Sequence, residues 1–246
     1  PETWKRKDFI QGQMVQKFEQ DFSKYVFAKH CVGVGSCTSA LQLSLLALGI
    51  GSGDEVITTP YTWVSSSECI KQVGATPVFV DINPDDMCIN ANAVQSKITK
   101  NTKAIIAVDL YGNVADIEKL QGHGIPVIED AAQSTGALYK GKVVGGIADI
   151  TCFSFYPTKN LSCWGDAGAV TTNNDDVAEK IKELRNHGQS KRFQIETIGW
   201  NSRMDTIHAE VLCRKLIHLD KWNAKRKQIA QWYNDEFKDR VKVPYP

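Results

Sequence analysis

The chain has 246 residues, 42% of them hydrophobic, and its 29 Lys and Arg nearly balance 28 Asp and Glu for a net charge of +1. This length and apolar content suffice for one large or two small globular domains. The charges are interspersed and form no basic face or tail, which argues against nucleic acid or an anionic membrane as a partner. No apolar stretch approaches the roughly 20 residues of a membrane span, and the polar first residues do not resemble a signal peptide.

Cysteine usage indicates the compartment. Seven cysteines are present, none in a C-x-x-C pair, and several lie inside apolar runs. An odd number of thiols without paired spacing is typical of a reducing environment. We therefore expect a soluble, cytoplasmic protein.

Short apolar runs alternate with longer amphipathic segments over most of the chain, after an amphipathic helix at 13–25. The expected strands are 31–34, 55–58, 77–80, 104–108, 126–128, 150–155 and 168–172. The expected helices between the earlier strands are 39–48, 64–73, 91–98 and 114–120. Connections of this length permit right-handed crossovers, so the alternation predicts an α/β fold with a mostly parallel central sheet flanked by helices.

Beyond residue 175 the pattern becomes mainly helical, with helices expected at 177–185, 206–219 and 221–237. We expect a large domain at 1–220 that includes the N-terminal helix. The segment 221–246 is then a helix leading toward a C-terminal domain that is absent or truncated.

A glycine-bearing turn at 33–39 follows the first expected strand and begins the next helix. Backbone N–H groups at a helix N-terminus, together with the Thr38 hydroxyl, can bind a phosphate. The turn partly fits the dinucleotide fingerprint, but Thr38 stands in place of its third glycine. Asp54 follows at the distance of about 20 residues that the fingerprint asks for. A capped turn without a ligand explains the pattern equally well.

Two carboxylates, Glu129 and Asp130, follow the strand expected at 126–128. Ligands of open α/β sheets bind beyond the carboxyl ends of the strands. Asp130 can be a magnesium ligand, a general base, a partner for a protonated ring nitrogen, or simply a helix cap. No other carboxylate motif nearby indicates a metal, and we predict none.

Lys159 lies in the turn after the strand expected at 150–155, beside aromatic residues. A lone lysine is usually a solvated charge, whereas one partly removed from water can form a Schiff base with an aldehyde. The next turn, Gly165-Asp166-Ala167-Gly168, lets backbone approach closely and leads into another strand. This context favours a functional lysine.

Ordered segments over nearly the whole chain resemble the DegT/DnrJ/EryC1/StrS family of nucleotide-sugar aminotransferases, which are fold-type I enzymes that use pyridoxal 5'-phosphate (PLP). The segments that carry the resemblance are Phe9-Ile10-Gln11-Gly12, 32–41, 53–57, Tyr61-Thr62-Trp63-Val64, 74–81, Glu129-Asp130-Ala131-Ala132-Gln133, Ser154-Phe155, Lys159-Asn160-Leu161, Arg185-Asn186-His187-Gly188 and 199–205. The resemblance implies an aspartate-aminotransferase-like large domain, followed in relatives by a smaller C-terminal domain of roughly a hundred residues.

The resemblance also implies roles for the residues around the PLP ring. Lys159 forms the Schiff base with PLP and then moves the proton between substrate and cofactor. Asp130 pairs with the pyridinium nitrogen, and Gln133 reaches the ring hydroxyl or the neighbouring edge. Trp63 lies on the face of the ring.

Further residues are implied to bind the phosphate and the substrate. Cys37, Thr38 and Ser154 hold the phosphate of PLP. Asn201 reaches the phosphate of the neighbouring subunit's cofactor, so that the active sites are shared across a homodimer. His187 contacts the substrate or is structural.

The implied reaction is a ping-pong transfer in which glutamate leaves as 2-oxoglutarate and a nucleotide-linked keto sugar receives the amino group, a step of deoxyamino sugar biosynthesis. The run from Lys159 to Leu161 followed by Gly165-Asp166-Ala167-Gly168 resembles members that act on 3-keto sugars, which favours a 3-keto-6-deoxy sugar. Members that act on 4-keto sugars more often show Gly-Glu-Gly-Gly there.

Three other interpretations remain open. A nucleotide-binding oxidoreductase explains the turn at 33–39 and Asp54 but gives Lys159 and Asp130 no joint role. A dehydratase of the same family is a second possibility, but such members carry His at this position and Lys159 argues against it. A non-catalytic or truncated PLP-fold protein is compatible with the whole pattern.

Overall fold

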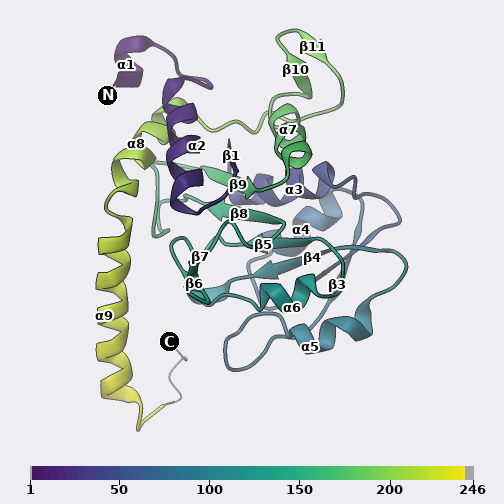
Figure 1. Cartoon of the computed structure of the whole chain (residues 1–246), viewed down its shortest axis with the longest axis vertical. Helices are drawn as coiled ribbons and strands as arrows, with labels where there is room; N and C mark the ends of the chain where they lie inside the picture. Colours follow the sequence, from purple (N-terminus) through teal and green to yellow (C-terminus); the bar gives the residue numbers. More distant parts are fainter. Residues whose placement is uncertain (1, 242–246) are drawn as a thin grey trace.

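A seven-stranded sheet with helices on both faces forms the centre of the molecule, in a computed structural model that describes residues 2–241 (Figure 1). The strands lie in the order β1-β9-β8-β5-β4-β2-β3. Their bounds are β1 His30–Val34, β2 Glu55–Thr58, β3 Thr76–Phe79, β4 Thr102–Val108, β5 Val127–Asp130, β8 Ile150–Ser154 and β9 Gly168–Thr172. Only β9 runs against its neighbours, which confirms the predicted mostly parallel sheet.

The helices largely follow the predicted segments. They are α1 Glu2–Arg6, α2 Gln13–Tyr25, α3 Cys37–Ala47, α4 Ser65–Gln72, α5 Ala91–Val94, α6 Ile117–Gln121, α7 Asp175–Leu184, α8 Thr206–Leu216 and α9 Leu219–Phe237, with short 3-10 turns at Gln95–Lys97 and Leu110–Gly112. Two small hairpins, β6 Leu138–Tyr139 with β7 Lys142–Val143 and β10 Gln189–Lys191 with β11 Gln194–Ile195, were not predicted, and neither was α1.

Two predicted helices are shorter than expected. The segment 91–98 is α-helical only to Val94 and continues as a 3-10 turn. The segment 114–120 becomes helical only at Ile117, because the Asp116 carboxylate caps that helix by accepting the Lys119 backbone N–H at 3.4 Å. In both places local hydrogen bonding sets the boundary, which hydrophobic spacing alone does not encode.

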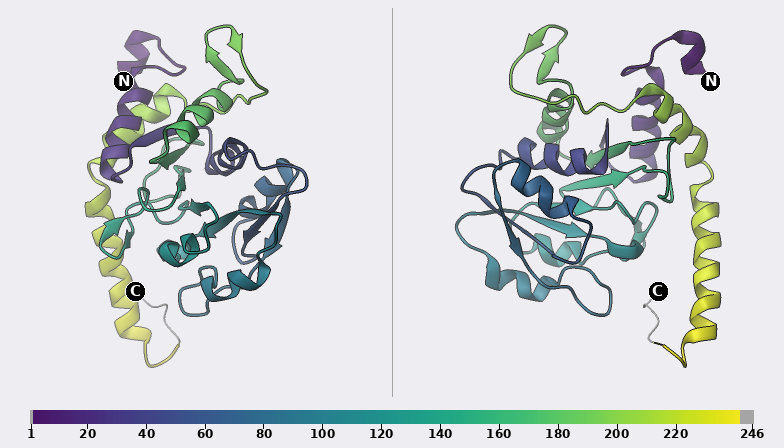
Figure 2. Two further views of the ribbon diagram at one scale, coloured as in Figure 1. Left: turned by 45° about the vertical axis from the view of Figure 1, so that its right-hand side comes forward. Right: turned by 180° about the vertical axis from the view of Figure 1, so that it is seen from behind.

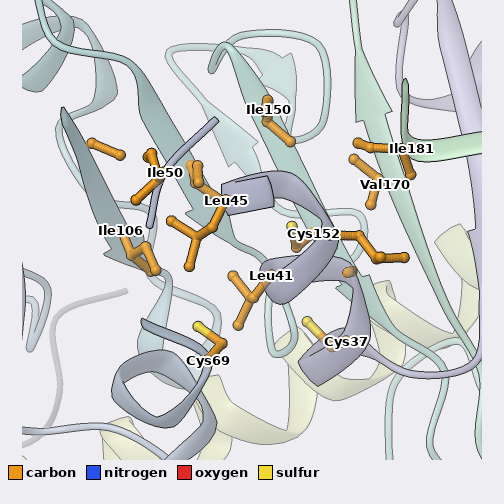
Figure 3. Close-up of a cluster of buried hydrophobic side chains, with 14 of the residues drawn as sticks. Cys37, Leu41, Leu45, Ile50, Cys69, Ile106, Ile150, Cys152, Val170 and Ile181 are labelled. Atoms are coloured by element: carbon orange, nitrogen blue, oxygen red, sulfur yellow. The ribbon is translucent and has the colours of Figure 1, made fainter. Parts of the chain in front are cut away.

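Alternating side chains divide the core between the two faces of the sheet. Helices α3, α4 and α7 cover one face, whereas α5 and α6, with α2 and α8 beside them, cover the other (Figures 1 and 2). Figure 3 shows Leu41 and Leu45 of α3 among strand residues of the first face, including Ile106 and Cys152. On the second face, Phe18 and Phe22 of α2 are fully buried one helical turn apart.

The last long helix, α9, leaves the body of the molecule and runs along its side (Figures 1 and 2). Leu219 is its buried residue, and most of the rest of the helix is exposed. The predicted segment 221–246 extends beyond the described residues at 242. Over residues 2–241, no helix combines the length and apolar character that crossing a membrane requires.

Candidate active site

A cavity of about 490 Å³ opens where the carboxyl ends of β4, β5 and β8 meet the N-termini of α3 and α4. Parallel strands place their carboxyl ends at one edge, which is where α/β sheets bind ligands. Seven residues predicted for the site line this cavity: Cys37, Thr38, Trp63, Asp130, Gln133, Ser154 and Lys159. The fold therefore assembles in one place residues that are up to 122 positions apart, counted from 37 to 159.

One end of the cavity is suited to a phosphate group. Ser36 caps α3, since its hydroxyl oxygen accepts the Ser39 backbone N–H at 3.1 Å. The first N–H groups of α3 remain available to an anion, as at other helix N-termini. The Thr38 hydroxyl lies 2.8 Å from the Ser65 hydroxyl, so two further polar groups line this end.

Gly168, the first residue of β9, makes this end possible. A Cβ atom at Gly168 would lie 2.5 Å from the carbonyl carbon of Ser36 and 2.7 Å from the backbone nitrogen of Cys37. These are backbone atoms of the turn itself, which cannot yield as a flexible side chain can. The predicted close approach after Lys159 is thus a contact between β9 and the glycine-bearing turn at 33–39.

Asp130 forms the buried acidic wall of the cavity and is only 6% exposed. Its carboxylate accepts the Ser66 hydroxyl at 2.8 Å and the Ala132 backbone N–H at 3.2 Å. Burial raises the pKa of Asp130, while these hydrogen bonds and the charge of Lys159 oppose that shift. A cation placed against this carboxylate would favour its ionised form.

Cys37 lies between the N-terminus of α3 and the buried carboxylate of Asp130. Its thiol points to Asp130, with Sγ 3.7 Å from Oδ1, and burial raises its pKa well above the usual value. The thiol is therefore neutral and faces the carboxylate. What Cys37 offers to a phosphate is its backbone N–H at the start of α3.

Lys159 is half-buried and stands in a turn closed by its own backbone N–H, which donates to the Tyr156 carbonyl at 2.9 Å. A second cavity of about 280 Å³ adjoins the first, and both are lined by Lys159 and Gln133. Gln133 Oε1 accepts the Tyr111 backbone N–H at 2.9 Å, which fixes its amide at the boundary between the cavities. Trp63, 75% exposed, stands at the rim.

Two predicted residues, His187 and Asn201, do not line the cavity. Both side chains are exposed, and they belong to paired segments, since Asn201 forms a β-bridge with Asn186. Residues 199–205, which we call the strap, pass beside the glycine-bearing turn at 33–39. There the Gly35 backbone N–H donates to the Ser202 carbonyl at 3.1 Å.

Asp54 also lies away from the cavity. Its carboxylate accepts the Gly51 backbone N–H at 2.9 Å and closes a turn before β2. In the dinucleotide interpretation this residue would bind a ribose, but here it has a local structural partner. Within the described part of the chain, no cluster of three or more His, Cys, Asp or Glu side chains could hold a metal ion.

Sequence reasoning missed the serines of α4. Ser65 lines the cavity beside Thr38, and Ser66 is the hydroxyl donor to Asp130. The Thr62 hydroxyl in turn lies 3.1 Å from that of Ser66. The available signal was three consecutive serines, 65–67, two residues after Trp63 at the beginning of a predicted helix.

Comparison with known proteins agrees with this geometry. A model of the DegT/DnrJ/EryC1/StrS aminotransferase family matches residues 2–245. The chain is 42% identical to the dTDP-3-amino-3,4,6-trideoxy-alpha-D-glucose transaminase of Streptomyces venezuelae, over 92% of this chain and 60% of that protein. It spans 60–66% of the length of the first three curated relatives that it matches.

Solved structures confirm the predicted fold class. The structure of S. venezuelae DesV in complex with a ketimine intermediate superposes with a TM-score of 0.93 at 40% identity, covering 97% of this chain and 66% of that one. The structure of NtdA from Bacillus subtilis with bound cofactor PMP gives a TM-score of 0.91 at 32% identity, covering 97% of this chain and 56% of the other. Both matches therefore place the present fold within a longer aminotransferase chain.

Proposed function

Because the chain belongs to the DegT/DnrJ/EryC1/StrS aminotransferase family, whose cofactor is PLP, we propose that the protein transfers an amino group from glutamate to a nucleotide-linked keto sugar. The observation that carries the proposal is that one cavity brings together the N-terminus of α3, a buried carboxylate and a half-buried lysine. A dinucleotide-dependent oxidoreductase would leave this combination without a purpose.

The residues fit PLP at its phosphate and at its ring nitrogen. Gly168 leaves the backbone N–H groups of Cys37 and Thr38 open for the phosphate, with Ser154 nearby on the lining. Asp130 would hold the ring nitrogen in its protonated state, because a cation there offsets the cost of burying the carboxylate. When bound, PLP supplies an electron-withdrawing ring that stabilises negative charge on the substrate carbon.

Lys159 would bind the cofactor covalently and transfer the proton. Its Nζ would hold the cofactor through a covalent bond, release it when the amino donor binds, and then carry a proton to or from the reacting carbon. Trp63 would cover the ring from the rim, and Gln133 would orient the ring edge from its fixed position beside Tyr111. Glutamate would leave as 2-oxoglutarate in the first half-reaction, and the sugar would take the amino group in the second.

For the acceptor we propose a 3-keto-6-deoxy sugar attached to a nucleotide. The support is the run from Lys159 to Gly168 noted above, together with 42% identity to a relative named as a 3-amino sugar transaminase. We keep His187 as a substrate contact, since its exposed side chain is available to a ligand.

The assembly is part of the same proposal. Asn201 is exposed and does not line the cavity of its own chain, which suits a role in the neighbouring subunit of a homodimer. We propose that 1–220 is the PLP-binding domain and that 221–246 leads to a further domain, as the exposed α9 suggests. The seven free cysteines support a cytoplasmic location.

The test is an assay with synthetic 3-keto and 4-keto nucleotide sugars, glutamate and PLP, followed by product analysis. We expect amination of the 3-keto compound and, after borohydride reduction, a cofactor adduct on the peptide that contains Lys159. Lys191→Ala, in the exposed β10, is the control for lysine replacement. Amination of only the 4-keto sugar would remove the regiochemical proposal, and a protein that binds no PLP would remove the whole assignment.

A further inference from the structure

A pair of fully buried carboxyl groups lies behind the cofactor cavity, with Asp109 directly after β4 and Glu129 in β5. Asp109 Oδ1 accepts the Ala115 backbone N–H at 3.0 Å, and Oδ2 accepts the Ser134 hydroxyl at 2.7 Å. Glu129 Oε2 accepts the Thr151 hydroxyl at 2.8 Å. Successive strand residues face opposite sides of a sheet, so Glu129 points away from the side that Asp130 faces.

Within the described part of the chain, the four carboxylate oxygens of the pair receive only three hydrogen bonds. One oxygen is therefore left without a donor if both groups are ionised. Among the described residues no hydroxyl or N–H donates to Glu129 Oε1, although that atom is buried. The register of β4 and β5 pairs Ala107 with Glu129 and Val108 with Asp130, so Asp109 lies on the same face of the sheet as Glu129 and beside it. Two carboxylates in contact away from water repel each other, whereas one proton between them removes a charge and supplies the missing donor.

Burial and the charge of Glu129 raise the pKa of Asp109 well above its usual value, which favours one proton on the pair. Burial also raises the pKa of Glu129, despite the hydrogen bonds from Thr151 and Asp109. The titratable groups around the pair are themselves acidic. Asp130 and Cys88 interact electrostatically with Asp109, and Cys152 of β8 interacts with Glu129. None of these groups favours a second negative charge.

Asp109 also connects the two loops that reach the cavity, through its backbone N–H and its carboxylate. Its backbone N–H donates to the Asp130 carbonyl at 3.1 Å, and its Oδ2 holds Ser134, the residue after Gln133. Gln133 is in turn bonded to the backbone N–H of Tyr111, two residues after Asp109. Loosening Asp109 would therefore release both loops from the edge of the sheet.

We propose that Asp109 is a positioning residue: it holds a proton shared with Glu129, and the protonated pair fixes the turn that presents Gln133 to the cofactor. Asp109 does not line either cavity next to Lys159 and acts only through its neighbours. The proposal rests on the proposed role of Gln133 in binding PLP. Its first test is independent of amino transfer.

The first measurement is the free energy of unfolding in urea as a function of pH. A folded state with raised carboxyl pKa values holds more protons than the unfolded chain, so its stability is lost as the pH rises through the folded values. We expect Glu129→Gln to lose less stability than the wild type as the pH rises from the ordinary glutamate pKa, about 4.3, to neutrality. Glu68→Gln, at an exposed position of α4, is the matched control. Identical pH profiles for Glu129→Gln and the wild type would overturn the shared proton.

Asp109→Asn is a second test of the shared proton, for the case in which Glu129→Gln does not fold. The amide keeps the size of the carboxyl and its N–H can donate to Glu129, as the protonated acid does. We expect this variant to fold and to show the flattened pH profile, because its donor cannot be titrated away. A profile as steep as that of the wild type would contradict the proposal.

The second measurement uses Ser134→Ala, which removes the link between Asp109 and the turn but leaves the pair intact. We expect faster hydrogen–deuterium exchange at residues 131–135 and a threefold to tenfold weaker affinity for PLP, as the loss of about one hydrogen bond implies. The pH profile of stability should stay that of the wild type. Unchanged exchange would overturn the positioning role, and so would faster exchange with unchanged PLP affinity. Neither outcome bears on the aminotransferase assignment, which the sugar assay tests separately.

Discussion

The cofactor cavity and the strap both contain predicted site residues, but they differ in what completes them. In the cavity, Asp130 and Lys159 lie on the lining formed by strand ends and helix N-termini of one chain. On the strap and the loop paired with it, Asn201 and His187 are exposed and contact neither cavity. The first region is fixed by the sheet, whereas the role we propose for the second requires another surface or ligand opposite it.

The largest expected effect is in the cavity, with Lys159→Ala. Amino transfer should fall by more than about 10³-fold, because the group that holds the cofactor and the group that moves the proton are lost together. Steady-state assays with glutamate and the sugar acceptor measure this loss. Retention of turnover would mean that another amine acts, and the cavity would not be the reaction centre.

Gly168→Ala changes the cavity without removing a functional group. The added Cβ would overlap backbone atoms of the phosphate-binding turn, and overpacking of this kind costs about 2 kcal/mol. We expect PLP to bind roughly thirtyfold more weakly in a spectroscopic titration. Gly51→Ala is the control, since a Cβ there meets only one carbonyl oxygen at 3.6 Å. Equal PLP affinity in both variants would contradict the placement of the phosphate.

Asn201→Ala tests whether the strap is completed by a second subunit. Loss of a hydrogen bond to the phosphate should weaken PLP binding by about tenfold. The decisive measurement is a mixed dimer of Asn201→Ala with Lys159→Ala subunits. If each site combines Lys159 of one chain with Asn201 of the other, one site of the mixed dimer is intact and binds PLP with wild-type affinity. If Asn201 serves its own chain, no intact site forms.

The smallest effect is expected for His187→Gln. The side chain is exposed, so its loss should leave PLP affinity and stability unchanged and raise KM for the sugar by about threefold, the value of one modest hydrogen bond. Kinetics at varied sugar concentration measure this change. A fall in kcat without a change in KM would place His187 in the chemistry instead.

The sequence predicted best the elements whose pattern is strong and local. The bounds of 13–25, 55–58 and 168–172 agree with α2, β2 and β9, because apolar spacing and flanking polar or glycine residues mark their ends. Helix α1 was missed since five residues carry no usable period, and a tertiary contact supports it: the Thr3 backbone N–H donates to Glu210 Oε2 at 3.1 Å.

The site residues show the same difference between features that the local sequence predicts and features that depend on tertiary contacts. Lys159 and Asp130 were predicted because each follows a recognisable strand and belongs to an ordered series of family segments. Ser66 and the pair of Asp109 and Glu129 were not, because their contacts come from the alignment of strands and helices. Strand register sets Val108 opposite Asp130, and nothing in the local sequence around Asp109 reports that it faces Glu129.

The close contact at Gly168 has a consequence for the evolution of such chains. If the turn keeps its backbone N–H groups open for a phosphate, as proposed, it cannot move aside, so a side chain at position 168 would weaken cofactor binding. A descendant that no longer bound PLP could let the turn shift and would be free to replace the glycine. Glycine at this position is therefore the residue that the proposed cofactor binding favours, and this chain carries it.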